Sequence, residues 1–210
     1  IERAIDLRLA LRSALLNCGE FARTLACVRE AERLAESLGD HQRLAQAKFF
    51  LCLHLYLRGE HGAAVRAGQQ AQALTAARDP ILHALAAYLL GIPLQAQGRY
   101  AQAVECFEQT LTALHGPLQR QFLNLAILPS VTSCAFLASC ASELGRFARA
   151  HDCAAEGLQI AEAVGHPPSV MFAAWGVGWA ALRQGDTARA LTFLERALGI
   201  CREAALVLHF

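Results

Sequence analysis

Three adjacent residues, His151, Asp152 and Cys153, combine the side-chain types that a nucleophilic active site uses. An imidazole base, a carboxylate and a thiol would have to converge on one point. The surrounding pattern is helical, and consecutive residues of a helix point in different directions. We therefore expect these side chains to diverge, and we assign no catalytic residue.

The cysteines and histidines show no spacing typical of a metal site. There is no C-x-x-C pair, and most of the eight cysteines fall in alanine-rich helical patterns where a small apolar residue fits. We expect reduced, buried thiols in a cytoplasmic protein, with no metal and no cofactor. Lys48, the only lysine, is flanked by Ala47 and Phe49, which excludes a Gly-Lys-Ser/Thr phosphate loop.

The charge balance argues against nucleic acid or a membrane as a partner. Nineteen Lys plus Arg against eighteen Asp plus Glu give a net charge of +1, and no basic run could follow a phosphate backbone. Residues 121–142 carry no charge and are long enough to span a bilayer. Pro129, Asn124 and several serines interrupt them, so we expect a loop and a buried helix. No export signal is visible, and the first residues already have a helical pattern.

The helical patterns that contain these histidines, cysteines and charged residues repeat along the chain. Five glycines, each between two apolar helical patterns, are spaced by 40, 39, 47 and 40 residues: Gly19, Gly59, Gly98, Gly145 and Gly185. Small residues follow them at two fixed positions. They are Thr24, Ala64, Ala103, Ala150 and Ala190 five residues on, and Ala31, Ala71, Thr110, Gly157 and Ala197 twelve residues on. The two positions share one helix face, which lets helices approach closely. Such a period predicts stacked helix pairs.

The chain resembles the tetratricopeptide repeat most clearly in LLGIPLQAQGRYAQAVECFEQTL (89–111) and WGVGWAALRQGDTARALTFLERAL (175–198). The family's signature positions hold Gly91, Tyr100, Ala103 and Phe107 in the first segment, and Gly178, Ala190 and Ala197 in the second. The resemblance implies an all-α fold, a right-handed superhelical solenoid of about five helix-turn-helix repeats. The repeats are expected at about 2–38, 41–77, 80–115, 131–164 and 168–204, with an insertion at 116–130. The period exceeds the family's 34 residues, so the helices or their connections are longer.

Asp40, Asp79 and Asp186 are expected to cap the starts of helices, and Pro80 and Pro168 to lie in first helical turns. Ten helices are predicted: 2–17, 20–38, 41–58, 60–77, 80–97, 99–115, 131–144, 146–164, 168–184 and 186–204.

Shorter strings, among them REAERLAESLGD, LPSV and LASCASELGRFARA, resemble the repeat region of bacterial multidomain signalling proteins that contain a class III adenylate or guanylate cyclase domain and an AAA-type ATPase domain. The resemblance implies a non-catalytic module that binds a protein segment or domains of the same parent chain, and thereby regulates a cyclase or ATPase. The alternative is a small-molecule sensor for a sugar or metabolite. A closed pocket with convergent polar groups would favour the sensor, and an open apolar trough a protein partner.

In tetratricopeptide solenoids the first helix of each repeat lines the concave surface. Carrying its positions over predicts a binding groove from Phe49, Leu53, Tyr56, Tyr88, Ile92, Gln95, Ser139, Phe172, Trp175, Trp179 and Arg183. Trp175 and Trp179 stand four residues apart and share a helix face. The alternative is that these aromatic side chains pack between neighbouring helices.

Two further expectations concern the irregular parts. The insertion GPLQRQFLNLAILPSV (116–131) has too many apolar residues for a free loop, and it either plugs a gap between repeats or forms a flap over the groove. The final stretch ALVLHF (205–210) is apolar where a polar capping helix is expected, so we predict self-association through the ends of the solenoid.

Overall fold

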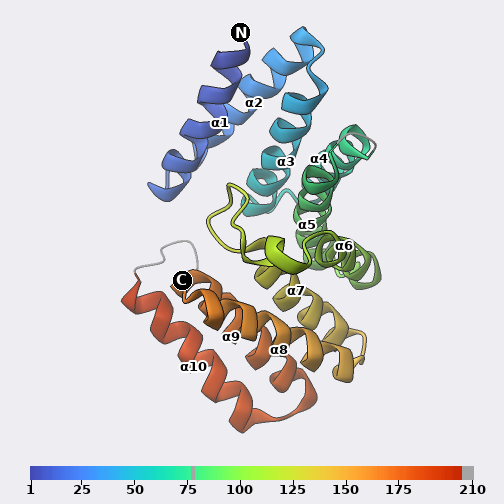
Figure 1. The fold of residues 1–210 in the computed structure, drawn as a ribbon, viewed down its shortest axis with the longest axis vertical. Coiled ribbons are helices and arrows are strands. Elements are labelled where there is room, and N and C mark those ends of the chain that lie inside the picture. The colour runs from blue at the N-terminus through green and yellow to red at the C-terminus, as the bar shows by residue number, and fades with distance from the viewer. Residues whose placement is uncertain (77–78, 205–210) are drawn as a thin grey trace. The chain divides into compact units, whose positions relative to one another are not determined.

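The computed structural model describes residues 1–76 and 79–204, apart from the side chains of Ser13 and Asn17. The apolar stretch 205–210 lies outside the described residues. The chain divides into two compact units, each described by itself (Figure 1). The first, Ile1–Gln97, contains α1 (Glu2–Asn17), α2 (Phe21–Leu38), α3 (His41–Leu57), α4 (His61–Thr75) and α5 (Pro80–Ala96). The second, Gly98–Phe210, contains α6 (Tyr100–Ala113), the 3-10 helix η1 (Gly116–Arg120), α7 (Pro129–Glu143), α8 (Phe147–Val164), α9 (Pro167–Gln184) and α10 (Thr187–Glu203).

The ten α-helices of the described residues correspond to the ten predicted ones, and their ends lie within two residues of the prediction. No strand occurs in the part of the chain that the structure describes. The all-α prediction is therefore confirmed.

Each repeat glycine ends the first helix of its pair in a left-handed backbone conformation. The φ angle lies between +71° and +91° at Gly19, Gly59, Gly98, Gly145 and Gly185. Residues with a Cβ atom rarely adopt this region, which explains the choice of glycine.

The predicted caps are present. A side-chain oxygen of Asp40, Asp79 and Asp186 accepts a hydrogen bond from the backbone N–H three residues further on, at 3.0, 2.9 and 3.1 Å. Each bond satisfies a donor that the helix leaves without an intrahelical partner. Pro80 begins α5, and that helix continues past Pro93 to Ala96.

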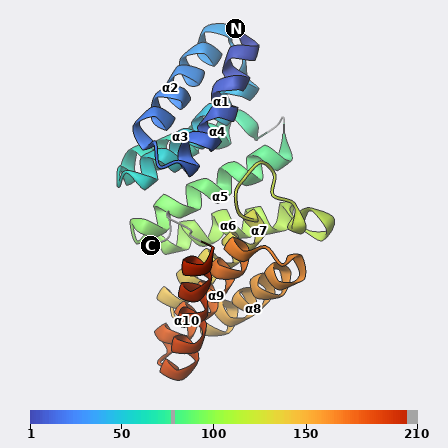
Figure 2. The same ribbon diagram turned by 90° about the vertical axis from the view of Figure 1, so that its left-hand side faces the viewer.

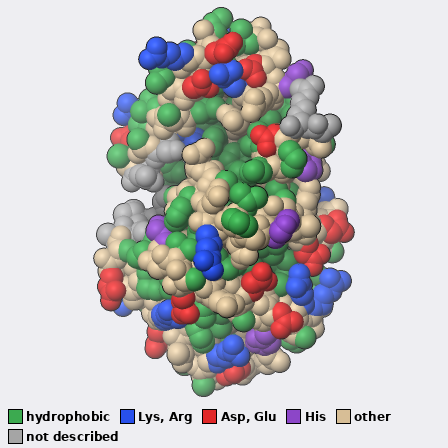
Figure 3. All heavy atoms as spheres, viewed as in Figure 1, with side chains coloured by type: hydrophobic (Ala, Val, Ile, Leu, Met, Phe, Trp, Pro, Cys, Tyr) green, Lys and Arg blue, Asp and Glu red, His purple; other side chains and the backbone are tan. Residues whose placement is uncertain are grey.

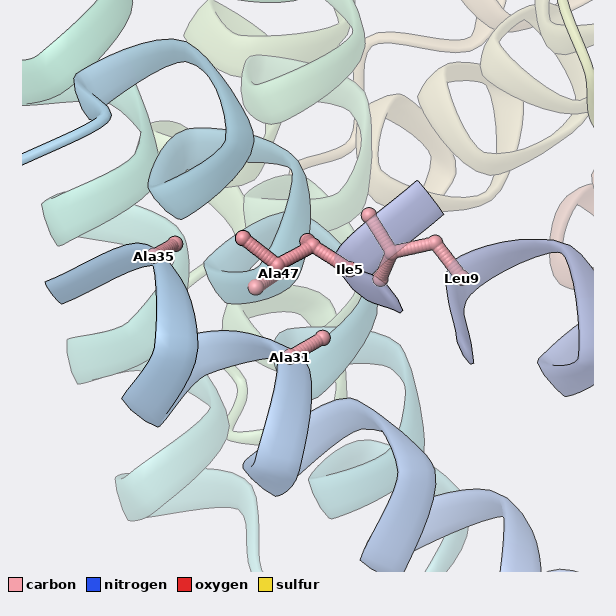
Figure 4. Packing of buried hydrophobic residues seen from close by; sticks show 5 residues of the cluster. All are labelled: Ile5, Leu9, Ala31, Ala35 and Ala47. Atoms are coloured by element: carbon pink, nitrogen blue, oxygen red, sulfur yellow. The ribbon is translucent and has the colours of Figure 1, made fainter. Parts of the chain in front are cut away.

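Small side chains bring the helices of the first unit together. Ile5 and Leu9 of α1 pack with Ala31 and Ala35 of α2 and with Ala47 of α3 (Figure 4). All ten small residues predicted five and twelve positions after the repeat glycines are buried. The small face thus lies at the helix contacts, as expected.

In the second unit two glycines make the contacts closer still. A Cβ atom on Gly176 of α9 would lie 2.9 Å from the Cα atom of Ala135 in α7. A Cβ atom on Gly178 would lie 2.7 Å from the Cγ atom of Leu194 in α10. Real Cβ atoms do not come this close to a neighbour, so α9 depends on glycine on two sides. Helices α7 and α9 lie side by side in both views (Figure 1, Figure 2).

The insertion packs onto the second unit. After η1 the chain runs without regular structure to Leu128, which is fully buried with Val131 of α7 and Ile160 of α8. Phe122 packs against the same cluster, and its ring lies 4.8 Å from that of His166, edge to face. The side chains of Leu128 and Phe122 therefore cover the ends of α7, α8 and α9, in the fourth and fifth repeats.

Charged side chains of both signs are interspersed on the face drawn in Figure 3. Several charged residues of the chain form ion pairs between successive repeats, such as Arg43 with Asp6 at 2.8 Å and Arg149 with Glu108 at 3.3 Å. Exposed pairs of this kind add little stability each. Among the described residues, none of the helices combines the length and apolar character needed to cross a membrane.

Candidate binding surface

Four aromatic side chains form a continuous row on the first helices of the fourth and fifth repeats. Phe136 comes from α7, and Phe172, Trp175 and Trp179 come from α9. All four are half-buried. We call this set the aromatic row.

The row is held together by edge-on and tilted ring contacts. The Phe136 ring centroid lies 6.0 Å from that of Phe172 and 5.6 Å from that of Trp175. Trp175 lies 6.4 Å from Phe172 and 6.0 Å from Trp179. These separations fall in the range where aromatic pairs attract each other beyond simple burial. The rings therefore support one another in one arrangement.

The row rests on a buried base. Phe172 and Trp175 pack against the cluster of Met171, Ala174, Ala197 and Cys201, which joins α9 to α10. Phe136 stacks at 5.7 Å on the fully buried ring of Phe107 in α6. The row is thus fixed by the core on one side and keeps part of its surface open to solvent.

An ion pair closes one end of the row. Arg183, one helical turn beyond Trp179, donates to the Glu143 carboxylate at 2.7 Å. The arginine side chain is about half exposed, while Glu143 is mostly covered. The Trp179 indole Nε1 atom is buried and has no hydrogen-bond partner among the described residues. The surface is thus apolar along the rings and charged at this end.

The structure separates the predicted groove residues by burial. Phe49, Tyr88, Ile92 and Ser139 are buried. Leu53, Tyr56, Gln95, Phe172, Trp175 and Trp179 are half-buried, and Arg183 is exposed. Residues Phe172, Trp175, Trp179 and Arg183 come together in the second unit. The role of these residues in binding stays a prediction.

In the first unit the predicted groove residues lie near two buried basic side chains, Arg12 and His54. Phe49 contacts the Phe50 ring at 4.7 Å, and the Arg12 guanidinium lies 3.6 Å over the Phe50 ring centroid. Burial lowers the pKa of Arg12 to about 10. Burial, and next the charge of Arg12, lower the pKa of His54 to about 4. His54 is therefore neutral at physiological pH.

The three adjacent residues His151, Asp152 and Cys153 diverge, as expected. His151 Nε2 contacts the Gln184 side chain of α9, and Asp152 is exposed. Cys153 is buried, and this burial raises the pKa of its thiol to about 11. The thiolate that a nucleophilic cysteine needs is disfavoured. Within residues 1–76 and 79–204, no group of three His, Cys, Asp or Glu side chains could hold a metal ion.

Phe136 is the member of the row that the sequence did not predict. The predicted groove residue of α7 was Ser139, and Ala135, the neighbour of Phe136, is buried beneath Gly176. Phe136 reaches the row because α7 and α9 touch at that glycine. The one available signal was its position three residues, or about one helical turn, before the predicted groove residue Ser139.

The comparisons with known proteins agree with this architecture. Family models described as tetratricopeptide repeat match residues 131–203 and residues 86–121. Comparison with curated proteins gave no match.

Solved structures share the fold over nearly the whole chain. A Podosopora anserina structure of nearly identical TPR-like repeats has a TM-score of 0.69 at 18% identity, covering 97% of this chain and 99% of that one. The apo form of RapI has a TM-score of 0.73 at 14% identity, with coverages of 96% and 71%. BtubC (BKLC) from P. vanneervenii has a TM-score of 0.63 at 22% identity, with coverages of 95% and 74%. At these identities the likeness shows the fold only, a solenoid of helical repeats.

Proposed function

Because the chain carries tetratricopeptide repeats, we propose that it is a non-catalytic protein-interaction module whose aromatic row receives apolar side chains of a partner segment. Helical-repeat proteins present extended surfaces for binding, built from successive repeats. The observation that carries the proposal is the aromatic row itself, four half-buried rings in mutual contact on two successive repeats.

The composition of the row suits a protein partner. Tryptophan and arginine are enriched among the residues that dominate binding energy at protein interfaces, and a large aromatic ring offers much apolar area. Trp175, Trp179 and Arg183 lie on one face of α9 at intervals of four residues. A partner segment with apolar anchors along the rings and an acidic group near Arg183 fits this order.

The fixed geometry of the row favours binding as well. Phe172 and Trp175 are held by the core cluster beneath them, and Phe136 by the buried ring of Phe107. Side chains that are already ordered lose little conformational freedom when a partner docks, so more of the contact energy remains as affinity.

Two finer proposals rest on the sequence. The resemblance to cyclase-associated and ATPase-associated repeat regions supports the proposal that the module regulates such a domain in a longer signalling protein. A sugar or metabolite sensor is the alternative, and it requires a small molecule that binds the row in place of a peptide.

The proposal is tested by selecting a random-peptide library against the chain and comparing the affinities of selected peptides for variants. Trp175→Leu should weaken binding at least about tenfold, which corresponds to roughly 1.4 kcal/mol. Phe147→Leu is the matched control, because Phe147 is also a half-buried aromatic residue of the second unit but belongs to α8.

Both variants should first be shown to unfold at urea concentrations close to that of the wild type. A failure to select any peptide, or equal affinities for the Trp175→Leu and Phe147→Leu variants, contradicts the proposal. Binding of sugars or metabolites by the wild type, lost in Trp175→Leu, would favour the sensor instead.

A further inference from the structure

The insertion between the third and fourth repeats is fixed to the second unit at two points, and both lead to the same histidine. We call residues 121–128, which join η1 to α7, the strap (Figure 1). Near its start, the Phe122 ring lies 4.8 Å from the His166 ring, edge to face. At its end, the backbone N–H of Leu128 donates to the Ser169 hydroxyl at 3.3 Å. That hydroxyl also lies 3.0 Å from His166 Nδ1.

These contacts determine which form of His166 fits. Ser169 is fully buried, and His166 Nδ1 is the acceptor that its hydroxyl proton has among the described residues. When the hydroxyl donates to Nδ1, its oxygen keeps a lone pair for the Leu128 N–H. A neutral ring with its own proton on Nε2 therefore satisfies all three groups.

A protonated ring does not fit in the same way. Both nitrogens of a histidine cation are donors, so Nδ1 no longer accepts the Ser169 proton. The ring N–H and the Leu128 N–H then both depend on one hydroxyl oxygen, and the buried hydroxyl proton loses its acceptor. A buried polar group without a partner costs free energy, and release of the strap recovers that cost.

The elements that surround His166 carry almost no charge. Residues 121–142 and 163–182 supply the strap, most of α7 and most of α9, and they contain no Asp, Glu, Lys or Arg and no second histidine. Their two cysteines, Cys134 and Cys140, are buried, and burial raises the pKa of both thiols. These thiols therefore stay neutral and offer no negative charge to a histidine cation.

The nearest charged residues do not compensate a proton on His166 either. Glu162, the closest carboxylate in the sequence, pairs with Arg196 of α10 at 2.8 Å. Arg120 of η1 is exposed and has the same sign as a protonated imidazole. His166 also precedes the first turn of α9, where the helix dipole disfavours a positive charge. Burial lowers the pKa of His166, in agreement with these surroundings.

The backbone of the strap adds local strain. Leu123 and Asn124 have φ angles of +50° and +63°, and the Leu125 N–H closes this turn by donating to the Phe122 carbonyl at 2.9 Å. Leucine adopts the left-handed region only at a cost in free energy. The docked strap is therefore held against this strain by its two anchors.

We propose that the protonation of His166 controls the strap: the neutral ring holds residues 121–128 on the second unit, and the protonated ring releases them. Release moves Phe122 and Leu128 away from the cluster that contains Val131 and Ile160 and opens an apolar surface there. This inference goes beyond the proposed function and does not depend on it, because none of the four rings of the aromatic row belongs to either anchor.

The direction of the pH dependence follows from the form that the docked strap prefers. Docking favours neutral His166, so its contribution is complete above the ordinary histidine pKa of 6.5. The contribution is lost as the pH falls through the lower pKa of the docked state. Between these two pKa values, the released fraction should rise by up to about tenfold for each pH unit.

Amide hydrogen exchange of the Leu128 N–H tests the proposal, because this amide is one of the two anchors. Its protection, corrected for the intrinsic exchange rate, should be lower at about pH 5 than at about pH 7.5, whereas amides in the middle of α7 should keep theirs. Equal protection of Leu128 at the two pH values, or an equal loss in the middle of α7, overturns the proposal.

His166→Asn is the decisive variant, because an amide oxygen still accepts the Ser169 proton but does not titrate. Its strap should stay docked at both pH values. His115→Asn is the matched control, since His115 is an exposed histidine directly before η1. This control should keep the pH dependence of the wild type. A pH dependence that persists in His166→Asn overturns the proposal.

An NMR titration of the His166 ring keeps the test independent of how well the variants fold. The pKa of His166 in the wild type should lie below 6.5, and its titration should follow the loss of Leu128 protection. In Ser169→Ala, which lacks the hydroxyl, the pKa should rise toward 6.5. A wild-type pKa at or above 6.5 overturns the proposal.

Discussion

The ionisation of His54 is coupled to folding. It is 2% exposed, and its Nε2 atom is buried with no hydrogen-bond partner among the described residues. Burial, and next the charge of Arg12, lower its pKa from 6.5 to about 4. The unfolded chain takes up a proton at this position near pH 6.5, and the folded chain only near pH 4. The neutral form thus stabilises the fold fully above pH 6.5, and this contribution is lost as the pH falls toward 4.

We predict that His54→Leu removes part of the pH dependence of the free energy of unfolding. Urea unfolding of the wild type and the variant at about pH 7.5 and about pH 4.5 measures the effect. Between the two pH values, the free energy of unfolding of the wild type should fall by roughly 3 kcal/mol more than that of the variant, because one pKa unit corresponds to about 1.36 kcal/mol. An equal loss in both proteins would show that His54 does not titrate as its surroundings indicate.

At the scale of elements, the contact between α7 and α9 sets the shape of the aromatic row. Gly176 has no room for a side chain, because a Cβ atom would lie 2.9 Å from the Ala135 Cα atom. Gly199 of α10 is the matched control, since a Cβ atom there meets no atom within 4 Å.

We predict that Gly176→Ala destabilises the fold by about 2 kcal/mol through overpacking. Gly199→Ala should instead stabilise it by about 0.5–1 kcal/mol, because alanine loses less backbone freedom in a helix. Thermal unfolding of the two variants beside the wild type gives the comparison. A shift of both melting temperatures in the same direction would be incompatible with a steric contact at Gly176.

The sequence predicted the elements well because their signals are local. Glycine is required where φ is positive, and aspartate caps the backbone N–H three residues further on. Small residues seven positions apart share one helix face. Each of these signals acts within one or two helical turns. The aromatic row was predicted only in part. Phe136 joins the row because α7 approaches α9 closely where Gly176 meets Ala135. These two residues are far apart in the sequence. The packing of the insertion escaped prediction likewise, because residues 121–128 have no periodicity that assigns their apolar side chains to particular helices.

At the scale of the molecule, the fold repeats a pair of helices, and the aromatic row spans the first helices of the fourth and fifth pairs. The most direct readout comes from the tryptophans, because Trp175 and Trp179 are the only two in the chain. Their emission therefore reports on the row and its immediate surroundings.

The deciding measurement is the tryptophan emission of the wild-type chain, titrated with a peptide selected from the random library. Binding at the row predicts a saturable change in emission whose midpoint equals the dissociation constant measured independently by calorimetry. The same titration of the Phe172→Leu variant should move that midpoint to higher peptide concentration. Saturable binding in the calorimeter with no change in emission would place the partner away from the aromatic row and contradict the account.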